Sequence, residues 1–181
     1  MKRSVKISLA GMLSAFAIAA SALESLLPPL PFAPPGFRIG FSNLASMVAA
    51  GVVSPFAAFA VAAVKSVFVL ITRGFTAFLL SLAGGLASAA CCVLILRFAR
   101  GKVGCIGVGV ASAAAHNLAQ VGVYSLIISS AAFWYLPYLL ILGTACGALT
   151  GALFDLSLKF MAKYQKTNAS PFGRAERNEN G

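Results

Sequence analysis

The side chains that could do chemistry in this chain are few, and they lie inside long apolar runs. His116, Asn117 and Gln120 belong to one run, and Tyr124 follows them, so that residues 116, 120 and 124 share one helix face at four-residue spacing. Lys65 lies near the middle of another run, where a charge costs about 2.5–3.5 kcal/mol and needs a partner or an aqueous cavity. Such groups predict hydrogen bonds, either to a small molecule or between helices.

The elements that position these groups are membrane helices. Hydrophobic residues make up 60% of the 181-residue chain and charged residues 10%, whereas roughly 25% of the residues in a soluble domain are charged. A helix needs about 20 apolar residues to cross a hydrocarbon core of about 30 Å. The apolar runs lie at residues 7–27, 39–53, 56–71, 75–96, 105–128 and 136–158.

These six runs predict an all-α membrane protein, a six-transmembrane-helix bundle that forms a single domain over residues 1–158. Residues 159–181 form a polar, basic C-terminal tail that we expect to fray. The run at 39–53 provides only about 22 Å of helix. We expect the proline-rich segment 28–35 before it to dip inward as a lid or a pocket wall.

The positive charges predict the orientation of the bundle. Most of the 14 Lys and Arg residues fall near the N-terminus, in the segment 97–102 and in the tail. Because cytoplasmic loops retain positive charge, we expect both termini to lie in the cytoplasm and the protein to lie in a bacterial inner membrane. The net charge of +10 is then a matter of topology, and we expect no nucleic-acid partner. Residues 1–22 also imitate a signal peptide, so cleavage there is an open alternative.

With this orientation, most of the other polar residues fall in the outer half of the membrane. Arg38, Arg73 and the N-termini of three helices favour an anionic group in a pocket open to the exterior. Glu24 is the acidic residue on that side, and we expect it to pair with one of the cations. The alternative is a structural role. The polar side chains would then form hydrogen bonds between helices, and the cations would extend to the membrane interface. The candidate substrate-binding residues are Glu24, Arg38, Asn43, Lys65, Arg73, His116, Asn117, Gln120 and Tyr124.

Small residues gather on three of the expected helices, in a pattern that lets helix backbones approach closely. We expect the ladder in the sixth run to pack inside the bundle. The ladder in the first run could equally pack inside or contact a partner protein. The sixth-run ladder is Gly143, Gly147 and Gly151, the first-run ladder is Gly11, Ala15 and Ala19, and a cluster in the fourth run is Gly84, Gly85 and Ser88.

The sequence lacks the motifs of a self-sufficient enzyme or pump. It has no P-loop, dinucleotide-binding glycine fingerprint, nucleophile elbow or HExxH motif. Apart from Glu24, the acidic residues fall at or near the C-terminal end, so no carboxylate cluster could hold Mg²⁺. We interpret the four cysteines as packing residues, with a redox pair at Cys91 and Cys92 as the alternative. We predict no catalytic residue, no metal and no cofactor.

Several segments, in a specific order, carry a resemblance to a known family over residues 7–158. They are ALESLLPP from Ala22, GFRIGFSNL from Gly36, LSLAGG from Leu80, AHNLAQ from Ala115, and the glycine ladder. With them the chain resembles the small membrane family labelled Gx transporter or heptaprenyl diphosphate synthase component I. That family resembles the substrate-binding S components of energy-coupling factor (ECF) transporters.

The resemblance implies a six-helix, vitamin-binding bundle without catalysis. Its outward pocket would be capped by the loop between the first two helices, and the face of Gly11, Ala15 and Ala19 would contact a transmembrane coupling subunit. ATPase subunits on other chains would drive import of a small, cofactor-like molecule such as a flavin, a thiamine precursor, or an isoprenoid or quinone precursor. The alternatives are an accessory membrane subunit for isoprenoid or quinone biosynthesis or electron transfer, and a stand-alone secondary transporter, which the lack of a visible internal repeat disfavours.

Overall fold

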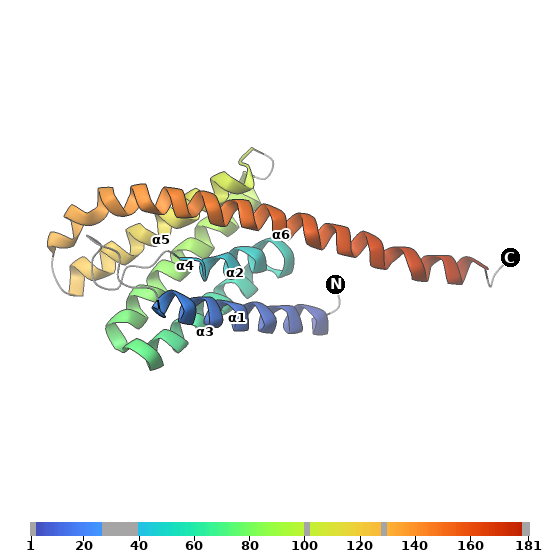
Figure 1. Cartoon of the computed structure of the whole chain (residues 1–181), viewed down its shortest axis with the longest axis horizontal. Coiled ribbons are helices and arrows are strands. Elements are labelled where there is room, and N and C mark those ends of the chain that lie inside the picture. The colour runs from blue at the N-terminus through green and yellow to red at the C-terminus, as the bar shows by residue number, and fades with distance from the viewer. Residues whose placement is uncertain (1–2, 27–39, 100–101, 128–129, 179–181) are drawn as a thin grey trace.

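The computed structural model describes residues 3–26, 40–99, 102–127 and 130–178, and every element in these ranges is a helix. Helices α3 to α6 pack each against the next along the chain, and α1 packs on α3. The N-terminal end of α1 and the C-terminal end of α6 lie toward the same end of the molecule (Figure 1). The elements are α1 Arg3–Leu26, α2 Asn43–Val48, η1 Ala49–Val53, α3 Pro55–Arg73, α4 Phe75–Phe98, α5 Cys105–Ile127, η2 Ser130–Tyr135 and α6 Leu136–Asn178.

Five helices in the described part of the chain are long and apolar enough to cross a membrane, so the chain is a multi-pass membrane protein. Helices α3, α4 and α5 match the predicted runs to within two residues at each end. They end where the sequence breaks the pattern: Gly74, at φ +89°, is the single residue between α3 and α4. The sequence therefore predicted these spans well.

The expected second span is shorter than predicted. The helix begins at Asn43 and ends at Val53, and its last five residues form a π-helix whose Ser54 N–H donates to the Ala49 carbonyl oxygen at 3.0 Å. Ser54 is extended and is the N-cap of α3, since its Oγ accepts from the Ala57 N–H at 3.2 Å. The whole segment rises about 16 Å, roughly half of a hydrocarbon core. The proline-rich segment expected to act as a lid or a pocket wall lies outside the described residues.

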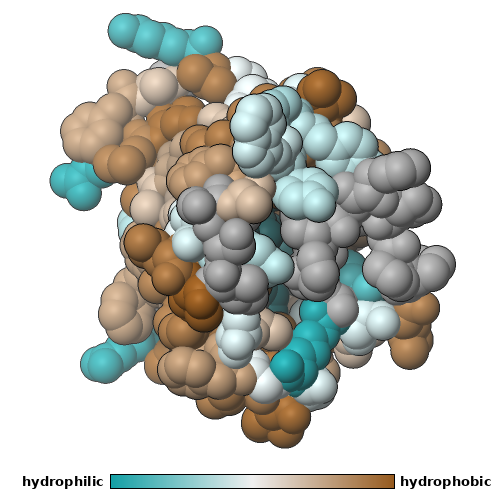
Figure 2. Space-filling model, turned by 90° about the vertical axis from the view of Figure 1, so that its left-hand side faces the viewer, coloured by the Kyte–Doolittle hydropathy of each residue, from teal (hydrophilic) through white to brown (hydrophobic). Residues whose placement is uncertain are grey.

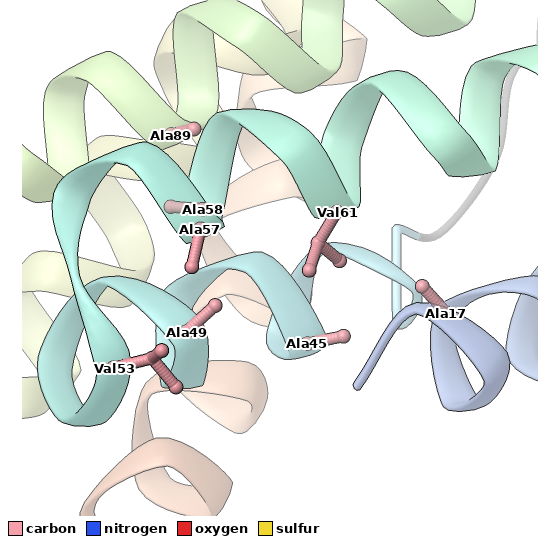
Figure 3. Packing of buried hydrophobic residues seen from close by; sticks show 8 residues of the cluster. All are labelled: Ala17, Ala45, Ala49, Val53, Ala57, Ala58, Val61 and Ala89. Atoms are coloured by element: carbon pink, nitrogen blue, oxygen red, sulfur yellow. The ribbon is translucent and has the colours of Figure 1, made fainter. Parts of the chain in front are cut away.

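The core between α1, α2, η1, α3 and α4 is built mainly from alanine (Figure 3). Small side chains let these helices approach closely, which compensates for the absence of a hydrophobic driving force in lipid. A second cluster at the η1 end of α2 surrounds Phe154 of α6, which is fully buried with Met47, Cys92 and Val108. Cys92 thus packs as predicted, and the three other free cysteines are half-buried.

The ladder in α6 packs inside the bundle, as predicted. Gly147 and Gly151 lie directly against α5, where a Cβ on Gly151 would be 2.6 Å from the Cys105 carbonyl oxygen and 2.7 Å from Ile106 Cα. Gly109 of α5 lies against the same two glycines. The α5–α6 contact is therefore backbone to backbone.

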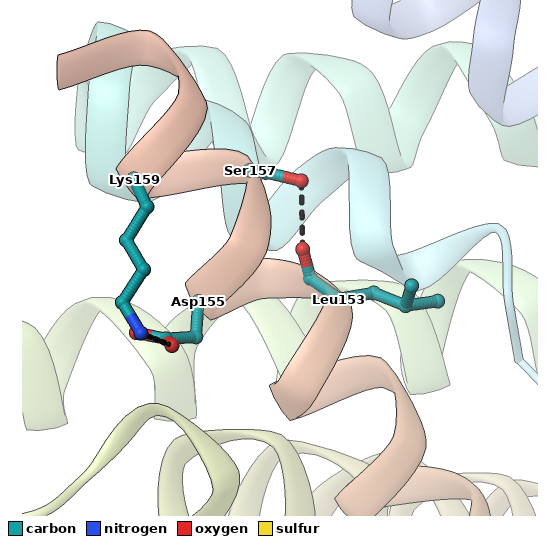
Figure 4. Close-up of polar contacts among 4 residues, drawn as sticks. All are labelled: Leu153, Asp155, Ser157 and Lys159. Atoms are coloured by element: carbon teal, nitrogen blue, oxygen red, sulfur yellow. Dashed lines mark hydrogen bonds and ion pairs between the residues drawn. The ribbon is translucent and has the colours of Figure 1, made fainter. Parts of the chain in front are cut away.

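The expectation that the tail frays from Lys159 onward is wrong, because α6 continues as a helix to Asn178 (Figure 1). The first part of this extension is rich in Ala, Lys and Gln, which are strong helix formers. Near its start, the Lys159 ammonium lies 2.6 Å from Asp155, one turn earlier (Figure 4). Helix propensity therefore outweighs the polarity on which the expectation rested.

Candidate functional site

Five of the nine predicted polar residues meet in a cavity near the end of the bundle opposite to the two termini. Its volume is about 30 Å³, and Figure 2 shows hydrophilic residues gathered near the middle of this end, beside the grey atoms, with apolar residues around them. We call it the cation cavity. Its polar lining includes Glu24, Ser42, Lys65, Arg73, His116 and Gln120.

Lys65 is the centre of the hydrogen-bond network. Its side chain is only 4% exposed, and its ammonium donates to Asn43 Oδ1 at 2.7 Å and to Ser42 Oγ at 3.4 Å. Both partners lie where the chain enters α2, and the Asn43 N–H donates to the carbonyl oxygen of Gly40, which has φ +84°. An ammonium has three donors, so the two bonds leave one N–H without a partner among the described residues.

Glu24 and Lys65 line the same cavity, with Ser42 between them. The Ser42 N–H donates to Glu24 Oε1 at 3.1 Å, while the Ser42 hydroxyl accepts from Lys65. Ser42 therefore links Glu24 to Lys65, while a direct pair of Glu24 with a cation stays a prediction. Ser42 was not among the predicted site residues, and its only signal in the sequence is its place beside Asn43.

Arg73 is the last residue of α3, and it lines the cation cavity. Its Nη2 is buried and has no hydrogen-bonding partner among the described residues. A buried guanidinium nitrogen without a partner loses solvation without compensation, so an acceptor in the cavity would stabilise it. Arg38, the other arginine predicted for this site, lies outside the described residues.

His116 contacts Asn43, and Lys65 fixes the direction of that contact. Because an ammonium only donates, the Asn43 oxygen must face Lys65, which leaves Asn43 Nδ2 as the atom 3.0 Å from His116 Nδ1. Nδ1 therefore accepts, and a neutral imidazole carries its proton on Nε2. Gly84 makes room for the ring, because a Cβ there would be 2.7 Å from His116 Cε1.

The remaining residues on α5 divide between the cavity and the helix contacts. Gln120 lines the cation cavity beside His116. Asn117 is buried, and its Nδ2 donates to the Leu139 carbonyl oxygen of α6 at 2.8 Å, which is a contact between helices. Tyr124 packs beside Val121 and Leu139 and is not among the cavity-lining residues. One helix face thus contributes His116 and Gln120 to the site, and its third member packs against α6.

The ladder in α1 faces away from the bundle. Gly11, Ala15 and Ala19 are all exposed, and a Cβ on Gly11 would have nothing within 4 Å. The buried face of α1 carries other residues, Ala17, Ser21 and Glu24. The structure therefore contradicts the alternative that this ladder packs inside the bundle, and contact with a partner protein stays a prediction.

The arrangement can bind a small anionic group. Lys65 and Arg73 supply two cations against one carboxylate, and both cations have donors that no described residue accepts. The described part of the chain contains no group of three His, Cys, Asp or Glu residues suited to a metal ion. The free donors of Lys65 and Arg73 can form charge-assisted hydrogen bonds to an acceptor in the cavity.

Comparisons with known proteins identify both a family and a fold. The family model described as heptaprenyl diphosphate synthase component I matches residues 13–156. A solved structure, the S component of a bacterial ECF transporter, has a TM-score of 0.65 to this chain at 17% identity, and the match covers 91% of this chain and 99% of that chain. At this identity the likeness establishes a shared fold. No curated protein sequence matches the chain.

Proposed function

The chain belongs to the heptaprenyl diphosphate synthase component I family, and we propose that it is the substrate-binding subunit of an ECF-type importer, with no catalysis of its own. It captures a small, cofactor-like molecule that carries an anionic group. The fold shared with an ECF S component supports the transporter class. The observation that carries the proposal is the cation cavity, where Lys65 and Arg73 both keep donors without described partners.

The size of the cation cavity supports binding of one anionic group rather than a whole cofactor. A water molecule needs about 10–15 Å³ of such volume, so about 30 Å³ is room for roughly two waters, or for a carboxylate. The anionic group of the substrate would displace these waters and accept from Lys65 and Arg73, as charge-assisted hydrogen bonds favour. As substrate classes, flavins, thiamine precursors and isoprenoid or quinone precursors are all compatible with such a site.

The exposed ladder on α1 supports a protein partner in the membrane. Gly11, Ala15 and Ala19 offer a surface on which another helix backbone can approach closely. We propose that this surface contacts the transmembrane coupling subunit, while ATPase subunits supply the energy. In this assembly both termini lie in the cytoplasm of a bacterial cell and the cation cavity faces the exterior. A reporter fused after Gly74 should report an exterior position, and one fused after Lys102 a cytoplasmic one; the reverse result would overturn the orientation.

The decisive experiment measures the small molecule that the protein retains. The wild type, Lys65→Met and Arg73→Gln are purified gently, and their bound small molecules are identified by mass spectrometry. We expect one anionic compound on the wild type and at least a tenfold loss in both variants, because each loses a charge-assisted hydrogen bond in a water-poor site. Lys159→Met is the control, since Lys159 is an exposed lysine distant from the cavity. Full retention by folded Lys65→Met and Arg73→Gln would overturn the anion site.

The family description favours one second function, an accessory membrane subunit for isoprenoid biosynthesis. The chain itself lacks an aspartate-rich motif for diphosphate chemistry, so a synthase activity would require a soluble partner. Purification from the native membrane separates the two functions. Coupling and ATPase subunits in the eluate support the importer, and a soluble prenyltransferase in their place supports the accessory subunit.

A further inference from the structure

A second cavity lies behind the cation cavity, on the side of α6. Its volume is about 20 Å³, and it shares Gly40 and His116 with the cation cavity. We call it the hydroxyl cavity, because its lining includes the hydroxyl side chains of three helices. They are Ser88 of α4, Ser112 of α5 and Thr150 of α6.

Two of these hydroxyls have no partner. Ser88 and Ser112 are each 1% exposed, and neither Oγ has a hydrogen-bonding partner in the described part of the chain. The thiol of Cys91 lies near Ser112 but is a weak hydrogen-bonding group. Thr150 differs, because its hydroxyl donates to the Gly147 carbonyl oxygen at 3.1 Å. Two buried hydroxyls in the lining of one small cavity need an occupant that can donate to them, accept from them, or do both.

The volume and the lining identify that occupant. A water needs about 10–15 Å³, so the roughly 20 Å³ of the hydroxyl cavity is enough for one water and at most two. None of the described residues that line the cavity has a carboxylate, and two hydroxyls are far from the six or more oxygen ligands that Ca²⁺ takes. An apolar cavity of this size would stay dry, but this one offers the two to four polar partners that a buried water requires.

We propose that the hydroxyl cavity is a binding site for one water molecule, held between Ser88 and Ser112. The water satisfies both hydroxyls and connects α4 to α5 one helical turn from the contact of Gly84 with His116. It continues the polar network of Lys65, Asn43 and His116 toward α6. The network therefore spans the bundle from Glu24 on α1 to the contact of α5 with α6.

The sign of a stability change distinguishes a hydrated cavity from a dry one. If the water is bound, Ser88→Ala and Ser112→Ala each remove one of its hydrogen bonds, and we expect each melting temperature to fall by about 2–4 °C. If the cavity is dry, each substitution removes an unsatisfied buried hydroxyl, and the melting temperature should rise. A rise in both variants would overturn the proposal.

The double variant and a direct observation complete the test. Because one water serves both hydroxyls, the fall in Ser88→Ala/Ser112→Ala should be smaller than the sum of the two single falls; an additive result would contradict a shared water. Ser66→Ala is the matched control, since its buried hydroxyl already donates to the Ala62 carbonyl oxygen at 2.8 Å. A density map that resolves ordered waters should show one water between Ser88 and Ser112, and an empty cavity there would also overturn the proposal.

Discussion

Helices α1 and α6 carry the same pattern of small residues, and the fold uses the two patterns in opposite ways. The ladder in α6 is buried against α5, whereas the ladder of Gly11, Ala15 and Ala19 in α1 faces outward. In the most apolar window of each helix, 33% of the α6 residues are buried but only 11% of the α1 residues. Small residues at four-residue spacing therefore predict that a helix will be approached closely, but the pattern does not say whether the partner is the same chain or another.

The largest effect expected from this comparison is the loss of stability in Gly151→Ala. Its new Cβ would be 2.6 Å from the Cys105 carbonyl oxygen, a backbone atom that cannot turn away. Overpacking a well-packed core typically costs about 1–3 kcal/mol, and we expect a value at the top of that range. Thermal unfolding in detergent measures the change.

The same substitution at the matching ladder in α1 should have the opposite sign. Gly11→Ala has open space around its new Cβ and gains helix propensity, so stability should rise by up to about 1 kcal/mol. Equal losses of stability in Gly11→Ala and Gly151→Ala would mean that both ladders pack inside the bundle, and the comparison would fail.

Asn117 adds a polar contact to the buried interface between α5 and α6. Asn117→Ala removes the hydrogen bond to the Leu139 carbonyl oxygen, and such bonds between membrane helices contribute about 0.6 kcal/mol on average and about 1.7 at most. Gln120→Ala, one turn along on the cavity side, should leave thermal stability nearly unchanged and reduce the retained small molecule about tenfold. If Asn117→Ala keeps full stability and loses the small molecule, Asn117 belongs to the binding site instead.

These residues show how far the sequence could predict the molecule. Hydropathy predicted the helices well, and the place of Lys65 near the middle of a run predicted that it would need a partner or a cavity, both of which the structure provides. Hydropathy could not predict that Asn43 contacts both Lys65 and His116, because the rotation of each helix about its axis is set by packing. For the same reason Tyr124, on the predicted face with His116, packs against Leu139.

Two other differences have local causes that the sequence hides. Hydropathy does not indicate where a helix changes to π geometry, and the backbone bond from Ser54 to Ala49 is visible only in the structure. Gly84 was selected as a packing residue, yet its missing side chain is what admits the ring of His116. The sequence shows that a glycine lacks a Cβ, but it does not show which neighbouring side chain occupies the space.

The third prediction tests the exposed side of the comparison. Ala15→Leu and Ala19→Leu should change stability by no more than about 0.5 kcal/mol, because both residues are exposed. Copurification with a coupling subunit should be lost, since the added bulk prevents close approach. Ala152→Leu is the matched control, because Ala152 is an exposed alanine on α6 outside the ladder. A partner that still copurifies with both α1 variants would contradict the docking surface.

The smallest effect is expected at the start of the α6 extension. Asp155 and Lys159 form an ion pair on the exposed part of the helix (Figure 4). Exposed pairs of this kind contribute little, so Asp155→Asn should leave the melting temperature unchanged within measurement error. A clear fall in the melting temperature would mean that this part of α6 packs against another segment or another protein.

The one-residue connection at Gly74 decides which way the site can open. Because α3 and α4 are joined there by a single residue, Gly74 at φ +89°, these two helices form a hairpin whose adjoining ends stay close together. Lys65 and Arg73 both belong to that hairpin. Both cations therefore lie on one arm of this tight hairpin, and we expect the widening that admits a substrate to come from movement of α1, α2 or α5 relative to it.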